Sequence, residues 1–332
     1  MKKNILATLL IVTTIMTSAC TGAKNSVVKV GDSYVSQSEF KYYLNSVKSQ
    51  MEGTELSSEE DWQTKEVEGK KAIDLAKEKS LDTAVDNLAY IEVGKKVVTL
   101  TDDDKNKITS LKNNIITRYG GQSKYNERIK SWGVDDKFID MLCESEIYHS
   151  KLEEKIESEN DITDDMLKET FKQKYRRAKH ILFLTQDMTT GLALSDDEKK
   201  AAYEKAQEVF VRAQSGEDFD ALAKEFTQDP GLASNPDGYV FTDGEMVSEF
   251  EDGVDMLQNG QMSFVTSSYG YHIIKRLPLD ETPELFESFF ESKKDDVKNI
   301  IINDLLEQKM EEWKSEYNIV IEKNDNVYNE IN

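Results

Sequence analysis

Proline is distributed very unevenly along this 332-residue chain. A proline ring fixes its own φ angle and removes a backbone N–H, so a proline breaks the interior of a helix. No proline occurs before residue 230, and the N-terminal half of the chain is therefore free to form long helices. The four prolines are Pro230, Pro236, Pro278 and Pro283.

The folded part of the chain is expected to open with a small β-hairpin. Two short β-rich runs, 27–30 and 33–35, flank Gly31-Asp32, and glycine permits the positive φ that a two-residue turn needs. Ser36 and Glu39 then form a capping box ahead of an amphipathic helix. Apolar spacing and caps predict four further helices, at 62–98, 101–120, 135–159 and 163–175.

The pattern changes at Arg176. Alternating runs predict strands at 177–184 and 271–277, with helices at 195–216 and 219–226 between them. Pro283 begins a long apolar helix that must pack on something, and the N-terminal helices are the available partner. We therefore expect a discontinuous helical domain with a second domain inserted into it. A last strand, 318–322, could pair with the opening hairpin.

The first twenty residues have the order of a secretory signal: two lysines, an apolar run over 5–16, and small residues before Cys20. The apolar run is too short to span a bilayer. The small residues before Cys20 resemble a bacterial lipobox, which implies cleavage after 1–19 and acylation (palmitate) of Cys20 on a short tether, 20–26. Thr17 departs from the usual Leu, so ordinary cleavage after Ala19 stays open.

Charge and composition exclude several classes of function. A net charge of -22, without a compensating basic run, argues against a nucleic-acid partner. Three histidines and two cysteines, without metal-ligand spacing, predict no metal site and no cofactor. Cys20 and Cys143 lie in such different contexts that a disulfide framework is not expected, and Cys143 is interpreted as a buried apolar residue.

Two of the histidines lie in apolar strands at opposite ends of the second domain. His180 follows Ala-Lys and precedes Ile-Leu, and His272 follows Gly-Tyr and precedes Ile-Ile. A solvated histidine suits neither position. One interpretation is a pair of hydrogen-bonded core histidines, and the other is a functional pair.

The residues between these histidines resemble the parvulin family of peptidyl-prolyl isomerases, in several ordered motifs over about 100 residues. The motifs are a helix that ends before Asp229, a Gly244-x-Met246 segment followed by Phe250, and a Ser267-x-Tyr269 segment before His272. With the signal and the flanking helices, the whole chain resembles foldase lipoproteins of the PrsA type, with SurA-like chaperones as distant relatives. The resemblance implies an α+β fold, with a four-stranded antiparallel sheet and surrounding helices in the inserted domain.

The resemblance also implies roles for single residues. It pairs His180 with His272, points Asp229 at the prolyl carbonyl, and lines the same floor with Ser267 and Tyr269. It places Met246 and Phe250 around the proline ring. For Met246 and Phe250 simple core packing is the alternative, and for Asp229 the alternative is a turn residue of Asp-Pro-Gly.

Two loops qualify the resemblance. Residues 185–194 contain no basic residue, so selectivity for phosphopeptides is not expected. Residues 235–239 read Asn-Pro-Asp-Gly-Tyr where parvulins usually have Gly-Gly-Asp-Leu-Gly. Proline restricts this loop, and Gly238 replaces the leucine that helps to wall the proline pocket. We therefore expect isomerase activity that is retained but weak.

Together these observations predict a foldase that is lipid-anchored on the extracytoplasmic face of a bacterial cell membrane. Its partners would be unfolded or partly folded secreted proteins. The helical domain, 27–175 with 281–332, would hold clients, and the parvulin-like domain, 177–278, would isomerise their X-Pro bonds. The alternative is a chaperone whose parvulin domain is weak or inactive. The oligomeric state stays open, a dimer included.

Overall fold

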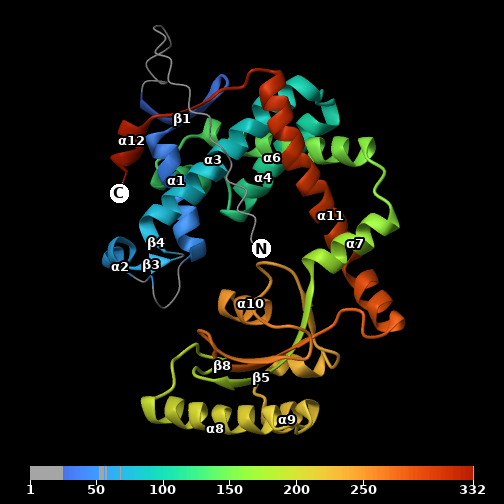
Figure 1. The fold of residues 1–332 in the computed structure, drawn as a ribbon. Helices are drawn as coiled ribbons and strands as arrows, with labels where there is room; N and C mark the ends of the chain where they lie inside the picture. The colour runs from blue at the N-terminus through green and yellow to red at the C-terminus, as the bar shows by residue number, and fades with distance from the viewer. Residues whose placement is uncertain (1–24, 52–55, 57, 68, 332) are drawn as a thin grey trace. The chain divides into compact units, whose positions relative to one another are not determined.

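A computed structural model describes residues 25–331 of the chain, except for 52–55, 57 and 68 (Figure 1). The expected signal peptide, Cys20 and all but the last two residues of the expected tether lie outside the described residues. The chain divides into two compact units, Met1–Asp161 with Ile302–Asn332, and Ile162–Ile301. No helix in the described part of the chain has both the length and the hydropathy to cross a bilayer.

The first unit is mostly helical and contains a three-stranded sheet of order β2-β1-β9. The expected hairpin turn is present, with Gly31 at a φ of 57°, and the expected pairing of the C-terminal strand with β1 is confirmed. Helix α3 packs against α1, α6 and β1. The elements are β1 (Ser26–Val30), β2 (Ser33–Ser36), α1 (Gln37–Met51), α2 (Glu59–Thr64), β3 (Glu66–Val67), β4 (Lys70–Lys71), α3 (Ala72–Val97), α4 (Asp102–Arg118), α5 (Gln122–Ser131), α6 (Asp136–Glu159), β9 (Ile321–Lys323) and α12 (Asp325–Asn329).

The prediction of one helix over 62–98 is wrong. The hairpin β3–β4 separates α2 from α3, and Gly69 between the two strands has a φ of 75°, which a helix cannot accommodate. Helix α5 has no counterpart among the predicted helices. Gly120 and Gly121 have φ angles of 83° and 100°, which end α4 and allow a new helix to begin at Gln122. The helices expected at 101–120, 135–159 and 163–175 are present within one or two residues of their predicted N-termini.

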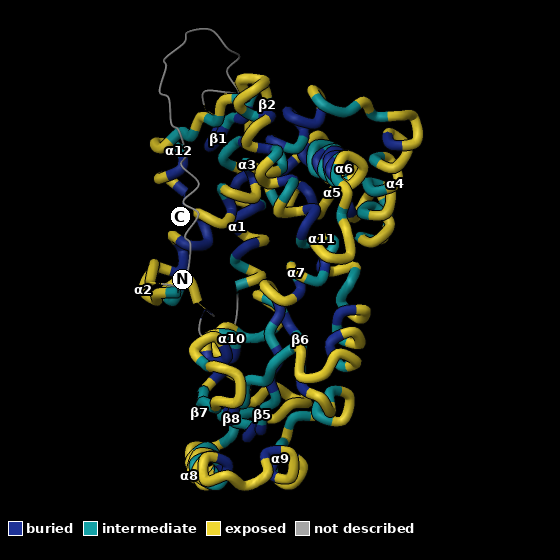
Figure 2. The backbone as a smooth tube through the Cα atoms, turned by 45° about the vertical axis from the view of Figure 1, so that its right-hand side comes forward, coloured by how far each residue is buried: buried dark blue, intermediate teal, exposed yellow. Residues whose placement is uncertain are grey.

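The second unit is built on one antiparallel sheet of order β6-β5-β8-β7, which confirms the α+β class and the four-stranded sheet. Helices α8 and α9 cover one face of this sheet, and α10 lies on the other (Figure 1). Burial along α8 is confined to one side of the helix, as Figure 2 shows. The elements are α7 (Asp164–Lys174), β5 (Arg176–Leu184), α8 (Asp196–Gln214), α9 (Phe219–Phe226), the 3₁₀ helix η2 (Pro230–Ala233), β6 (Tyr239–Phe241), α10 (Ser248–Asp255), β7 (Met262–Thr266) and β8 (Gly270–Leu277).

The long helix α11 (Pro283–Glu316) belongs to both units, because the division falls at Ile301. The contact-based boundaries therefore differ from the expected ones, and α7 and the first half of α11 are grouped with the sheet of the second unit. The expected functional boundaries, 177–278 inside 27–175 and 281–332, stay a prediction.

Each face of the β5–β8 sheet has its own core. Ile181 and Ile273 pack with residues of α8 and α9 on one face. Ala178 and Ile274 pack with Phe250 of α10 on the other. Since side chains alternate along a strand, His180 and His272 must lie on the face that α10 covers.

Candidate active site

The two strand histidines form a direct pair. His180 lies opposite Ile274 and His272 lies opposite Leu182, so the two imidazoles are diagonal neighbours on one face of β5 and β8. Their rings are stacked, with centroids 5.3 Å apart and planes at 11°. The two Nδ1 atoms are 3.0 Å apart, which is a hydrogen bond. The structure thus brings together the histidines that the sequence separates by 92 positions.

The hydrogen bonds continue at both ends of the pair. His180 Nε2 lies 2.9 Å from Asp229 Oδ2, and His272 Nε2 lies 2.7 Å from Ser267 Oγ. We call the four side chains Asp229, His180, His272 and Ser267 the histidine network. His272 and Ser267 are buried, and His180 and Asp229 are nearly so.

Asp229 sets the direction of the donors in this network. An ionised carboxylate only accepts, so His180 Nε2 donates to Asp229. In a neutral His180 the other nitrogen, Nδ1, then accepts from His272 Nδ1–H. The remaining nitrogen, His272 Nε2, accepts from the Ser267 hydroxyl. Every polar atom of the network is satisfied in this arrangement, which requires one tautomer of each histidine.

The electrostatics favour this neutral arrangement. Burial and, to a smaller extent, the nearby His180 lower the pKa of His272 to about 4, although Asp229 opposes the shift. Burial by itself raises the pKa of Asp229. Hydrogen bonds from His180, Tyr239 and the Gly231 N–H outweigh that effect, and the pKa of Asp229 lies at about 2. Near neutral pH the network therefore holds an ionised Asp229 and a neutral His272.

Both earlier interpretations of Asp229 describe its contacts. As a turn residue, Asp229 caps η2, and its Oδ1 accepts from the Gly231 N–H at 2.9 Å. As a site residue, it accepts from His180 through Oδ2. One carboxylate makes both sets of contacts.

Phe250 of α10 lies against the network, and Met246 lies in the segment before α10. Phe250 is buried and meets both imidazoles edge-on, with centroids 5.2 Å from His180 and 5.7 Å from His272. Met246 is half-buried and packs on the same apolar cluster. Phe250 is therefore a core residue that also forms an apolar wall beside the histidines.

The Tyr269 side chain takes no part in the described hydrogen bonds of the network and is 41% exposed. Only its backbone N–H reaches the site, donating to Ser267 Oγ at 3.1 Å. Ser267 Oγ accepts there while its own hydroxyl donates to His272. The contribution of Tyr269 to the network is thus to orient the serine.

Tyr239 is a site residue that the sequence analysis missed. Its hydroxyl donates to Asp229 Oδ2 at 2.6 Å, and its ring lies edge-on to His180 at 5.5 Å. Burial raises the pKa of Tyr239, and Asp229 raises it further, so the hydroxyl stays protonated. The aromatic residue after Gly238 was the available signal, but it was interpreted only as a departure from the parvulin pattern.

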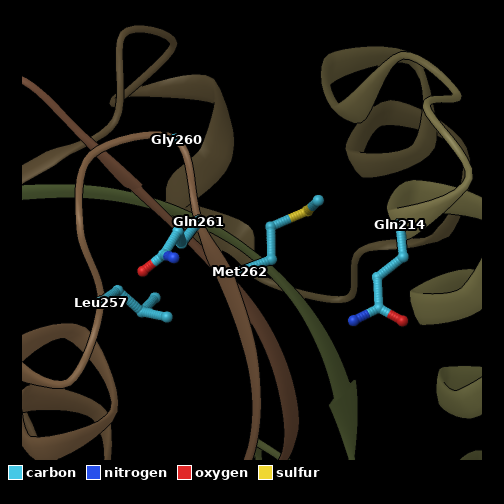
Figure 3. A pocket seen from close by; sticks show the side chains of 5 residues that line it. All are labelled: Gln214, Leu257, Gly260, Gln261 and Met262. Atoms are coloured by element: carbon cyan, nitrogen blue, oxygen red, sulfur yellow. The ribbon is translucent and has the colours of Figure 1, made fainter.

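Other candidate sites in the described residues are weaker. Figure 3 shows a pocket in the second unit that contains no member of the histidine network and is lined by Gln214, Leu257, Gly260, Gln261 and Met262. No three His, Cys, Asp or Glu side chains in the described ranges are placed to hold a metal ion. In the loop at 185–194, Asp187 accepts hydrogen bonds from Thr189 and Thr190. The histidine network is therefore the strongest candidate site.

Residues 180–277 match the family described as Rotamase, PPIC-type PPIASE domain. The chain is 28% identical to the foldase protein PrsA of Caldanaerobacter subterraneus subsp. tengcongensis over 291 residues, 84% of this chain and 82% of the relative. It is 26% identical to foldase protein PrsA of Clostridium tetani over 326 residues, 90% of this chain and 87% of the relative. A crystal structure of peptidylprolyl isomerase (PrsA) from Bacillus anthracis covers 70% of this chain and 96% of that chain, with 22% identity and a TM-score of 0.33.

The matched family region begins at His180 and ends with β8, so it spans the whole histidine network. Both relatives are foldases, and each alignment extends far beyond this region into the helical part of the chain. The chain therefore resembles the PrsA-type parvulin foldases over most of its length, and its second unit carries a parvulin-type peptidyl-prolyl cis–trans isomerase domain.

Proposed function

We propose that the histidine network and the Phe250 wall carry the isomerase activity of this foldase, and that the protein works on secreted clients at the extracytoplasmic face of a membrane. In this proposal Asp229, His180, His272 and Ser267 orient the prolyl carbonyl, with Tyr269 supporting Ser267. Met246 and Phe250 hold the proline ring.

The chemistry of isomerisation fits these residue types. Resonance keeps a peptide bond planar, with a barrier of about 18–20 kcal/mol, and the catalyst has to favour the twisted, less conjugated state. An apolar wall disfavours the charge-separated planar form, and Phe250 supplies such a wall next to the hydrogen-bonding groups. No nucleophile and no cofactor is needed.

The observation that carries the proposal is the continuous line of hydrogen bonds from Asp229 to Ser267 beside Phe250. A pre-arranged set of dipoles in a water-poor site needs little reorganisation when the bond twists. A network whose only task was to satisfy buried polar groups would not need an ionised carboxylate at one end.

An exchange assay on X-Pro peptides tests the proposal, with the wild type, Asp229→Ala and Asp280→Ala. Asp280 is an exposed residue between β8 and α11 in the same unit, so its variant controls for the loss of one negative charge. We expect Asp229→Ala to lose most of the activity and Asp280→Ala to keep it. Equal rates for all three proteins would remove Asp229 from the catalytic set. An inactive wild type would favour the chaperone alternative.

Client holding is proposed for the helical part of the chain. If holding and isomerisation are separate, Asp229→Ala should still suppress the aggregation of an unfolded client as well as the wild type does. A loss of holding in parallel with isomerase activity would place both functions in the parvulin domain.

The proposed membrane anchor is the acylated Cys20. Cys143 is free and buried, so Cys143→Ala is the control. Labelled palmitate should be incorporated into the wild type and into Cys143→Ala, but not into Cys20→Ser. Cys20→Ser should also leave the membrane fraction or stay unprocessed. Unchanged labelling and membrane retention in Cys20→Ser would contradict the lipoprotein proposal and favour ordinary signal cleavage or a retained signal.

A further inference from the structure

The Asp229 carboxylate has two donors more than the histidine network requires. Oδ2 accepts from His180 Nε2 at 2.9 Å and from the Tyr239 hydroxyl at 2.6 Å, while Oδ1 accepts from the Gly231 N–H at 2.9 Å. Two of these donors, the Tyr239 hydroxyl and the Gly231 N–H, lie outside the histidine pair. The tyrosine bond is the shortest of the three.

The chain around Tyr239 is shaped to place its hydroxyl there. Tyr239 pairs with Ala178 at the start of β6, two residues before His180 on β5. Gly238 has a φ of 96°, and a Cβ at that position would lie 2.9 Å from the Ala178 carbonyl oxygen. A Cβ on Gly231 would collide with the Tyr239 hydroxyl itself. Both glycines therefore make room for the approach of this tyrosine.

The loop before Tyr239 is also anchored. The Asn235 side chain donates to the Gly231 carbonyl at 3.0 Å, and the Gly238 N–H donates to the Asn235 carbonyl at 3.0 Å. The buried Arg177 donates through Nε to the Asp237 carbonyl at 2.7 Å. The loop that departs from the usual parvulin pattern is thus an ordered support for Tyr239.

We propose that Tyr239 is a positioning residue for the isomerase reaction: its hydroxyl fixes the orientation of the Asp229 carboxylate and, through it, holds His180 in the Nε2–H tautomer. This inference rests on the proposed role of Asp229 in catalysis. It assigns Tyr239 no contact with the substrate.

The orientation of the Asp229 carboxylate determines which atoms donate in the rest of the histidine network. With Nε2–H directed at Asp229, His180 Nδ1 must accept, His272 must donate from Nδ1, and the Ser267 hydroxyl must donate to His272 Nε2. If the carboxylate turned away, the His180 proton could sit on either nitrogen, and the donors of His272 and Ser267 could reverse. Tyr239 therefore stabilises one donor order out of two.

Histidine ¹⁵N spectra of the full-length chain test the inference directly, since the chain has only three histidines. The wild type should show His180 protonated at Nε2 and His272 protonated at Nδ1. In Tyr239→Phe we expect His180 to populate both tautomers, while the His149 resonances stay unchanged. On X-Pro peptides kcat should fall about 3- to 10-fold with KM unchanged, which is the effect of one hydrogen bond.

Tyr271→Phe is the matched control. Tyr271 precedes His272 on β8, points to the opposite face and packs against Phe264 and Tyr203. Its variant should keep the wild-type tautomers and the wild-type kcat. Gly231→Ala offers a second perturbation, because its methyl group displaces the tyrosine hydroxyl while the tyrosine remains. It should reproduce the tautomer mixture of Tyr239→Phe.

The inference requires that both the tautomer of His180 and kcat change in Tyr239→Phe. A single Nε2–H tautomer of His180 in Tyr239→Phe and Gly231→Ala overturns it, whatever happens to kcat. An unchanged kcat in Tyr239→Phe also overturns it. If Asp229 has no role in catalysis, Asp229→Ala keeps wild-type activity. The histidine spectra then still report whether Tyr239 holds His180 in one tautomer.

Discussion

The Nδ1 atoms of His180 and His272 face each other at 3.0 Å across two stacked rings. Only one of the two atoms can carry a proton in a hydrogen bond of this kind, because a second N–H would place two donors in contact. The pair therefore resists full protonation. Burial acts in the same direction and holds the pKa of His272 at about 4, against 6.5 for an ordinary histidine.

The stability of the parvulin domain should consequently fall on acidification through this window. Between pH 6.5 and about 4 the unfolded state binds a proton at His272 that the folded state does not bind, so the free energy of unfolding decreases as the pH falls. The total effect is on the order of 3 kcal/mol. Asp229 contributes at lower pH, because its pKa is about 2 in the folded state and 3.8 ordinarily.

Urea titrations at several pH values, followed by the native His272 resonance, measure this dependence. Tryptophan fluorescence is unsuitable, since Trp62, Trp132 and Trp313 all lie in the other unit. His272→Gln removes the titrating group and should flatten the profile from pH 6.5 to 4, read from a resonance of Ile273. A profile of the variant as steep as that of the wild type would assign the effect to another group.

Ser267→Ala should destabilise the domain and reduce isomerase activity. It leaves the buried His272 Nε2 without its donor, at a cost of about 1–3 kcal/mol in the free energy of unfolding. Ser263→Ala on β7 is the control, because the Ser263 hydroxyl makes only a 3.3 Å bond to the Gly253 carbonyl. Similar losses of stability and rate in the two variants would argue against a special role for the Ser267–His272 bond.

Replacing residues 235–239 with Gly-Gly-Asp-Leu-Gly should lower the activity of this chain. The replacement removes the Tyr239 hydroxyl from Asp229 and places a leucine at 238, where φ is 96°. A leucine at that φ costs of order 1–3 kcal/mol. Thermal unfolding and the X-Pro exchange assay check both effects. A faster enzyme after the replacement would show that the native loop limits catalysis.

Arg177→Lys should loosen the same loop from the other side. Arg177 is 3% exposed and donates to the Asp237 carbonyl, the Pro278 carbonyl and Glu281. A lysine cannot make this fork of bonds, so we expect a loss of about 1–3 kcal/mol in unfolding free energy. Arg212→Lys, on the exposed Glu217 pair, should cost less than about 1 kcal/mol. Calorimetry of both variants measures these losses of unfolding free energy. Equal losses in Arg177→Lys and Arg212→Lys would contradict the prediction.

The strand part of the site could be predicted from the sequence. Alternation along β5 and β8 places His180 and His272 on one face, and the ordered motifs between them indicated Asp229, Ser267 and Phe250. The shared face of the two histidines follows from regular strand geometry, whereas Asp229, Ser267 and Phe250 were indicated by the resemblance to parvulins. Spacing does not determine where the Tyr269 side chain points, because Tyr269 lies in the turn before β8. Its expected place on the floor of the site therefore could not be derived from the strand pattern.

Tyr239 escaped prediction for a related physical reason. Its position depends on two glycines, Gly231 and Gly238, that act from different segments, and on Arg177 from a third. The hairpin β3–β4 likewise depends on Gly69 in a stretch whose apolar spacing favours a helix. In both cases a local conformation of glycine outweighs the periodic pattern around it.

The sheet β2-β1-β9 has a consequence for synthesis. Its first two strands emerge at the beginning of the chain, and β9 emerges only after residues 162–301 have been made. The second unit is contiguous and can complete its folding while β1 still presents an unpaired edge. The second unit can therefore be complete while the sheet of the first unit still lacks β9, so the isomerase domain does not depend on closure of that sheet.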